Sequence, residues 1–213
     1  MERNITISLE KAVEWYNSGN DSLKEVALQA FNKDELTYNF KNITTFKKAC
    51  EALGLNYDNM FYITKNIATI SKASAAMFKL NIIRKALNLG QDLHLTKDPK
   101  DFYIYYPYNP FVTKSSTYYK SEINSGKMEV IGKIKSEGEE YNVLSDSVTN
   151  YGDAGLGSFY SRDGVGLAIA NFGFLGCANK EIAQHFGKYF GMLITEAKFA
   201  DMVDFEIVER KYQ

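Results

Sequence analysis

The sequence predicts an α+β protein, in which an N-terminal helical module is followed by a mainly antiparallel sheet with one packed C-terminal helix. Three observations support this prediction: helical periodicity in the first hundred residues, β-prone runs after them, and the placement of glycine. Only three of the 15 glycines lie in residues 1–100, and the other 12 lie between Gly126 and Gly191. We therefore divide the chain into a helical module, residues 1–100, and a Gly/Tyr-rich β domain, residues 101–213, which ends with a helix and a strand.

Four helices are expected in the helical module, each with an apolar stripe. Ser8 precedes the first helix as an N-cap, and Gly19 follows its end. Ser22 and Glu25 have the spacing of a capping box, which predicts that a second helix begins at Ser22. The four expected helices cover residues 9–17, 22–31, 45–53 and 71–89.

The β domain is expected to hold short strands separated by glycine-containing turns. Its last strand, residues 203–208, places Phe205 and Ile207 on one side and charged residues on the other. Asn179 is expected to cap a helix over residues 180–197. The other expected strands cover residues 102–106, 128–134, 140–144, 157–161, 165–170 and 172–177.

The composition is that of a soluble globular protein. Hydrophobic residues make up 45% of the chain, and the net charge of −1 gives no bulk attraction to nucleic acid or to an acidic membrane. Cys50 and Cys177 are 127 positions apart, so a reducing compartment is a simpler interpretation than a disulfide framework. The N-terminus lacks the pattern of a signal peptide, and no window resembles a membrane span.

Few residues suit catalysis or metal binding. The chain has two histidines and two cysteines without zinc-site spacing, so we predict no metal site and no cofactor. One enzyme hypothesis stays open, because Cys177 and His185 lie eight positions apart across a strand-to-helix junction that could lower the pKa of the thiol. The alternative is that Cys177 is a small buried residue and His185 lies half-exposed on the helix.

Nucleic-acid binding by the helices within residues 8–54 is a second open alternative. Lys41, Lys47 and Lys48 cluster near the third expected helix. Acidic residues between positions 10 and 35 dilute that charge, and no helix face forms a basic stripe. A docking or capping role for these helices is the competing interpretation.

Aromatic residues are the strongest compositional signal, with 15 Tyr and 14 Phe beside one Trp. Tyrosine joins a large apolar body to a polar tip, and in an alternating strand one set of rings must face water or a partner. We therefore expect the β domain to contact a protein partner, with ordinary cross-strand packing as the alternative. Homo-oligomerisation through the edge of the last strand is left open. The expected contact residues are Tyr103, Tyr105, Tyr106, Tyr108, Tyr118, Tyr119, Tyr160 and Arg162.

Five segments of the chain form a series: residues 8–31, 45–54, 82–90, 105–107 and 174–190. Together they resemble uncharacterised proteins of phages and prophages of Bacteroides-type gut bacteria. The segments occur in the order of that family and are spread over most of the length of the chain.

The chain departs from this family at residues 91–94, where Gln-Asp-Leu-His stands in place of a Trp-Pro-Asp-like run. The resemblance implies a mobile-element origin and a location in the host cytoplasm or the virion, and it supplies no activity or site residues. We therefore expect a phage- or prophage-encoded, non-enzymatic binding protein, either a virion-associated component or a factor that binds a host protein.

Overall fold

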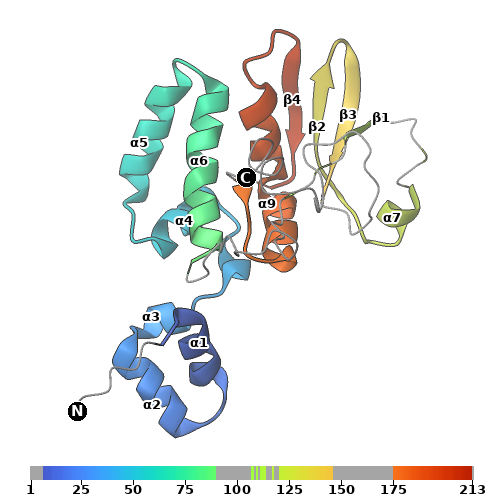
Figure 1. Cartoon of the computed structure of the whole chain (residues 1–213). Helices are drawn as coiled ribbons and strands as arrows, with labels where there is room; N and C mark the ends of the chain where they lie inside the picture. The colour runs from blue at the N-terminus through green and yellow to red at the C-terminus, as the bar shows by residue number, and fades with distance from the viewer. Residues whose placement is uncertain are drawn as a thin grey trace, which may run out of the picture.

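The computed structural model describes residues 7–89, 107, 109, 111–113, 117, 120–145 and 175–212. These residues form a series of N-terminal helices, a four-stranded antiparallel sheet and a long C-terminal helix (Figure 1). The predicted α+β class is therefore confirmed. Among the described helices, none is long and apolar enough to cross a membrane.

The first three helices form a small unit beside the N-terminus, with a hydrophobic cluster of their own around Ala12, Ala27 and Leu36 (Figure 1). The predicted start of the second helix is wrong. Asn20 is the N-cap and accepts hydrogen bonds from two backbone amides, whereas Ser22 already lies inside the first turn. The bounds of the three helices are Leu9–Asn17 (α1), Asp21–Ala30 (α2) and Lys33–Leu36 (α3).

A second set of helices follows a short 3-10 turn. Thr45 and Ser71 cap two of these helices at the predicted positions. The helix between these two, α5, was not predicted. Asn56 caps it, and Thr64 is its buried residue. The bounds are Phe40–Asn42 (η1), Phe46–Ala52 (α4), Tyr57–Ala68 (α5) and Lys72–Leu87 (α6).

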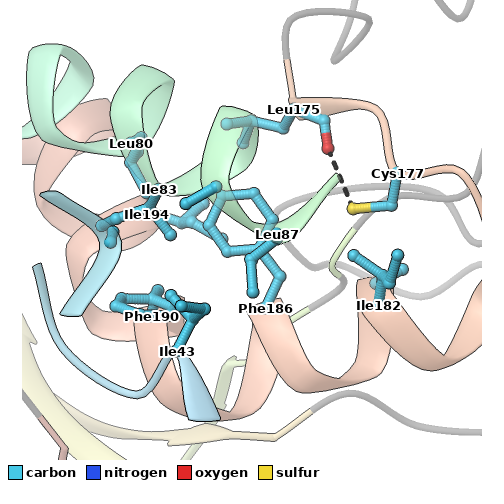
Figure 2. Close-up of a cluster of buried hydrophobic side chains, with 13 residues drawn as sticks. Ile43, Leu80, Ile83, Leu87, Leu175, Cys177, Ile182, Phe186, Phe190 and Ile194 are labelled. Atoms are coloured by element: carbon cyan, nitrogen blue, oxygen red, sulfur yellow. Dashed lines mark hydrogen bonds between the residues drawn. The ribbon is translucent and has the colours of Figure 1, made fainter. Parts of the chain in front are cut away.

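The largest hydrophobic core lies between α6 and the long helix α9 (Lys180–Phe199), which Asn179 caps as predicted. Because α6 and α9 come from the two halves of the chain, the halves share this core. The boundary near residue 100 remains an interpretation of the composition. Figure 2 shows the core side chains Ile43, Leu80, Ile83, Leu87, Leu175, Cys177, Ile182, Phe186, Phe190 and Ile194.

The sheet lies on the other side of α9 from α6, with its described strands in the order β1-β3-β2-β4 (Figure 1). Glu137 and Gly138 join β2 to β3 with positive φ angles of 50° and 82°, which suit a tight hairpin turn. The bounds are Phe111–Thr113 (β1), Lys120–Asn124 (α7), Val130–Ser136 (β2), Glu139–Leu144 (β3) and Phe205–Arg210 (β4).

The last strand, β4, carries the predicted alternation, since Phe205 and Ile207 are half-buried and Glu206 is exposed. Its pairing with β2 shifts register at Val208, and such a bulge disfavours regular pairing with another strand. Self-association through β4 stays a prediction. The strands expected at 102–106, 157–161 and 165–170 lie outside the described residues, as do residues 172–174 of the strand expected at 172–177. The described part of that last strand, residues 175–177, forms no strand, so the prediction is wrong there.

A buried asparagine ties the sheet to α9. The side-chain amide of Asn109 donates hydrogen bonds to the carbonyl oxygens of Leu144, at 2.9 Å, and Gly187, at 3.0 Å. Gly191 makes room for this contact, because a Cβ at that position would lie 2.5 Å from the Asn109 amide nitrogen. The close packing of α9 on the sheet therefore depends on a glycine in the middle of a helix.

Candidate functional site

The predicted tyrosine surface lies outside the described residues, so its role stays a prediction. Pro107 and Asn109, which alternate with two of these tyrosines in the sequence, are described and buried. This part of the segment therefore touches the protein interior at two points. The predicted residues outside the described set are Tyr103, Tyr105, Tyr106, Tyr108, Tyr118, Tyr119, Tyr160 and Arg162.

Cys177 lies in the hydrophobic core between α6 and α9 and is 1% exposed. Its thiol is 3.5 Å from the carbonyl oxygen of Leu175 (Figure 2). A thiol in this position cannot meet a substrate without a conformational change. The surroundings of Cys177 therefore favour the buried structural role over the catalytic one.

His185 is held in one tautomer. Its Nε2 lies 2.8 Å from the carbonyl oxygen of Ile43, so Nε2 carries the hydrogen and Nδ1 holds the lone pair of the neutral ring. Burial lowers the pKa of His185. The positive charges of Lys188 and Lys41 lower this pKa further, and only the hydrogen bond to Ile43 raises it. Among the described residues, no group of three or more His, Cys, Asp or Glu side chains could hold a metal ion.

Four aromatic rings from three distant segments form a continuous row, which we call the ring row. His185 and Tyr189 lie one helical turn apart on α9, with ring centroids 4.5 Å apart. Phe40 meets the edge of His185 at 5.5 Å, and Tyr212 meets Tyr189 at 4.9 Å. All four rings are half-buried, so each keeps some surface open to solvent.

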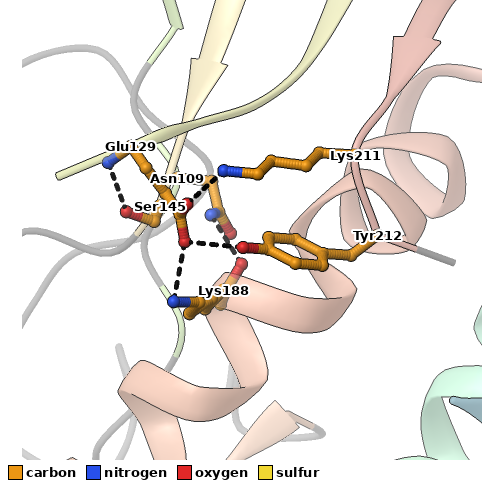
Figure 3. A network of polar contacts seen from close by, with 7 residues as sticks. Asn109, Glu129, Ser145, Lys188, Lys211 and Tyr212 are labelled. Atoms are coloured by element: carbon orange, nitrogen blue, oxygen red, sulfur yellow. Dashed lines mark hydrogen bonds and ion pairs between the residues drawn. The ribbon is translucent and has the colours of Figure 1, made fainter. Parts of the chain in front are cut away.

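A shared carboxylate fixes one end of the ring row. Glu129 accepts hydrogen bonds from the Tyr212 hydroxyl at 2.9 Å and from the ammonium groups of Lys188 and Lys211 (Figure 3). Burial raises the pKa of Glu129, but these bonds outweigh burial and bring the pKa to about 2. The backbone amide of Glu129 donates to Ser145 Oγ, which ties this residue to the end of β3.

Two open hollows flank the ring row. The larger, of about 560 Å³, is lined by Ile123, by residues 126–130, by Ser145 and by Gln184, His185 and Lys188. The smaller, of about 300 Å³, lies on the side of Tyr189 and Tyr212 and reaches α4 and α6. The charged side chains around the row and hollows are Lys41, Lys79, Lys127, Lys188, Arg210 and Lys211, with Glu129, Glu181 and Glu196.

Of the residues in the ring row and around its hollows, the sequence analysis names only His185 and Lys41 as candidate functional residues. The other rings and Glu129 are separated by tens of residues, so no local spacing relates them. The lysines of the helical alternative do not act together: Lys41 lies over the Phe40 ring, and Lys47 pairs with Glu51 on the same helix. Basic and aromatic side chains therefore lie together along α9 and not on the first helices.

A separate apolar surface lies on α5. Three consecutive large residues, Phe61, Tyr62 and Ile63, are 49%, 66% and 39% exposed. The Phe61 ring stacks on Tyr57 at 5.9 Å, and Tyr57 meets Phe46 of α4 at 6.0 Å. One side of α5 packs on the other helices, while these three residues leave apolar side chains facing solvent.

Comparison of the chain with protein-family models, with curated proteins and with solved structures found no match.

Proposed function

We propose that this chain is a non-enzymatic binding protein that attaches to another protein through α5, in the phage or prophage setting that the sequence resemblance implies. The exposure of Phe61, Tyr62 and Ile63 is the observation that carries the proposal. Large apolar side chains that are exposed beside polar residues are typical of protein-binding sites. Full burial of a large apolar side chain contributes about 1.5–3 kcal/mol, so three partly exposed ones offer roughly 1 kcal/mol each.

A second apolar spot lies at the end of α5 and supports the same proposal. Ile70, in the turn between α5 and α6, is 89% exposed, and Val203, in the turn between α9 and β4, is 99% exposed. Asp201 holds the two turns together by accepting hydrogen bonds from the Lys72 backbone amide, at 2.9 Å, and from the Ser71 hydroxyl. Figure 1 shows both turns at the upper end of the molecule, where one partner could cover them together with α5.

The surface of α5 indicates the chemistry of its partner. Asp58 and Lys65 are its charged residues, so the helix carries charges of both signs and little net charge. We expect a partner with an apolar face and an affinity that changes little with salt. The tyrosine-rich β domain remains a further proposed contact region.

A photo-crosslinking amino acid at position 62, with one at Gln29 of α2 as the exposed control, tests the proposal in infected or lysogenic cells. A host or phage protein should be captured from position 62 and not from Gln29. The purified partner should then bind the wild-type chain and the Gln29→Asp control equally, and Tyr62→Asp at least tenfold more weakly, about 1.4 kcal/mol.

Equal binding by Tyr62→Asp and the control would refute a role for α5. Capture of a second copy of this chain at position 62 would overturn the proposal of a foreign partner. Mass spectrometry of purified particles distinguishes the two settings, since a virion component is present in the particles and a host-directed factor is not.

A further inference from the structure

The ring row and its two hollows form a surface that α5 does not share. The hollow of about 560 Å³ has the volume of a site for one small organic group, and the second is about 300 Å³. His185 lines the first hollow, and Tyr189 and Tyr212 line the second, so neighbouring rings of the row border both hollows. A ligand that occupies both hollows would therefore lie beside the aromatic rings.

This surface is cationic although the chain is not. Among the residues that the structure describes, six Lys and Arg side chains and three carboxylates lie around the row, in a protein whose net charge is −1. Glu129 holds Lys188 and Lys211 at once, so one positive charge of that trio has no negative charge to balance it. The excess of positive charge favours a polyanionic ligand.

The lysines also lie over the rings. Lys188 Nζ is 5.6 Å from the centroid of Tyr189 and 5.8 Å from that of Tyr212, and Lys211 Nζ is 5.4 Å from the Tyr212 centroid. Cation–π contacts of this kind at exposed sites are worth only about 0.5–1 kcal/mol. A phosphate can therefore draw the ammonium group off the ring, and a planar base can take its place.

We propose that the ring row binds single-stranded nucleic acid, with bases stacked on Tyr189 and Tyr212 and phosphates held by Lys127, Lys188 and Lys211. A row of rings beside cationic side chains is the arrangement that binds single strands without regard to sequence. A duplex keeps its base faces inside the stack, so it cannot use rings that are half-buried between two hollows. An acidic peptide would use the cations and leave the rings unused.

Fluorescence anisotropy of the full chain with a labelled oligothymidylate of about 20 nucleotides tests the inference. We expect micromolar binding at about 50 mM salt, and a salt slope near −2 for three phosphate contacts on a single strand. An unlabelled duplex of the same length, and thymidine monophosphate at the same nucleotide concentration, should each compete at least tenfold less well than the unlabelled strand.

Matched variants separate this surface from general surface charge. Lys127→Gln and Tyr212→Leu should each weaken binding about fivefold or more, whereas Lys65→Gln and Tyr62→Leu on α5 should leave it unchanged. Tyr212→Phe keeps the ring and removes the hydroxyl that bonds Glu129, so it should retain more of the binding than Tyr212→Leu does. Circular dichroism of each variant checks that it is folded.

Three results would overturn the inference. The first is the absence of saturable binding at low salt at protein concentrations up to about 100 μM, because even non-specific binding of nucleic acid has a dissociation constant at or below that value. The second is an equal loss of binding in the ring-row variants and the α5 controls. The third is displacement of the oligonucleotide by polyglutamate as efficiently as by unlabelled strand, which would assign the surface to an acidic peptide. None of these results bears on the α5 proposal, because Tyr62 is the residue tested in that proposal and only a control in this one.

Discussion

Replacing Glu129 by glutamine removes a carboxylate that three donors share and keeps the shape of the side chain. In the folded protein, burial raises the pKa of Glu129 but the hydrogen bonds from Lys188, Lys211 and Tyr212 lower it further, from 4.5 to about 2. At about 1.4 kcal/mol per unit, full transmission to stability would give roughly 3 kcal/mol. Because 27% of the Glu129 side chain is exposed, screening should leave about 1–2 kcal/mol.

The sign of this effect sets its pH dependence. The folded-state pKa lies below the unfolded value, so the contribution is complete above pH 4.5 and is lost as the pH falls through about 2. Urea denaturation of the wild type and Glu129→Gln should show a gap in unfolding free energy of about 1–2 kcal/mol at neutral pH. The gap should narrow by more than half by about pH 3.

A matched control identifies the cause of the gap. Glu139→Gln removes an exposed carboxylate from the neighbouring strand β3, and it reports the effect of losing one negative charge alone. A gap that stays constant from neutral to acid pH would refute the reasoning. An equal gap for Glu129→Gln and Glu139→Gln would also show that the three-donor network contributes nothing.

Two further predictions test the packing around α9. Gly191→Ala should lower the unfolding free energy by about 1–3 kcal/mol, although alanine favours a helix by about 1 kcal/mol, because its Cβ would lie 2.5 Å from Ile131 Cδ1. Urea denaturation measures the change, and a gain in stability would contradict the close packing. In a Cys50→Ala background, Cys177 should react with a thiol reagent only as fast as the protein opens, because it is 1% exposed. Rapid labelling of the native protein would instead restore the cysteine-enzyme hypothesis.

The two proposed surfaces respond to salt in different ways, which allows them to be studied in one protein. Burial of Tyr62 and its neighbours on α5 depends on apolar area, so partner binding there should persist as salt rises. Phosphate contacts along the ring row release counterions, so binding there should weaken steeply. A partner captured at both low and high salt therefore belongs to α5.

Local signals in the sequence were sufficient for most of the helices. Ser8, Thr45, Ser71 and Asn179 are each followed by a helix, because a side-chain oxygen at that position satisfies a backbone amide that the first turn leaves unpaired. The same rule failed at Ser22, because Asn20 two residues earlier caps the helix first. Only residues close to a helix start can accept hydrogen bonds from its first amides, so an error in the cap shifts the predicted start by one or two residues.

Helix α5 shows where local reasoning ends. Its inward positions Tyr57, Met60 and Thr64 do recur at helical spacing, but an exposed apolar run, Phe61 to Ile63, blurs the contrast between the two faces. Aromatic and β-branched residues also have modest helix propensity. Packing against α6, which is separated from α5 by only three residues, stabilises the helix.

The sequence by itself determined the caps at Ser8, Thr45, Ser71 and Asn179 and the α+β class, because these signals depend on side chains a few residues apart. Only the tertiary structure decided which distant residues lie next to one another on the surface of α9. Phe40, Glu129, His185 and Tyr212 come together because α9 packs on α6 by one face and on the sheet by another, with Gly191 allowing the close approach. Contacts between distant segments follow from the packing of whole elements, and no short-range spacing encodes them.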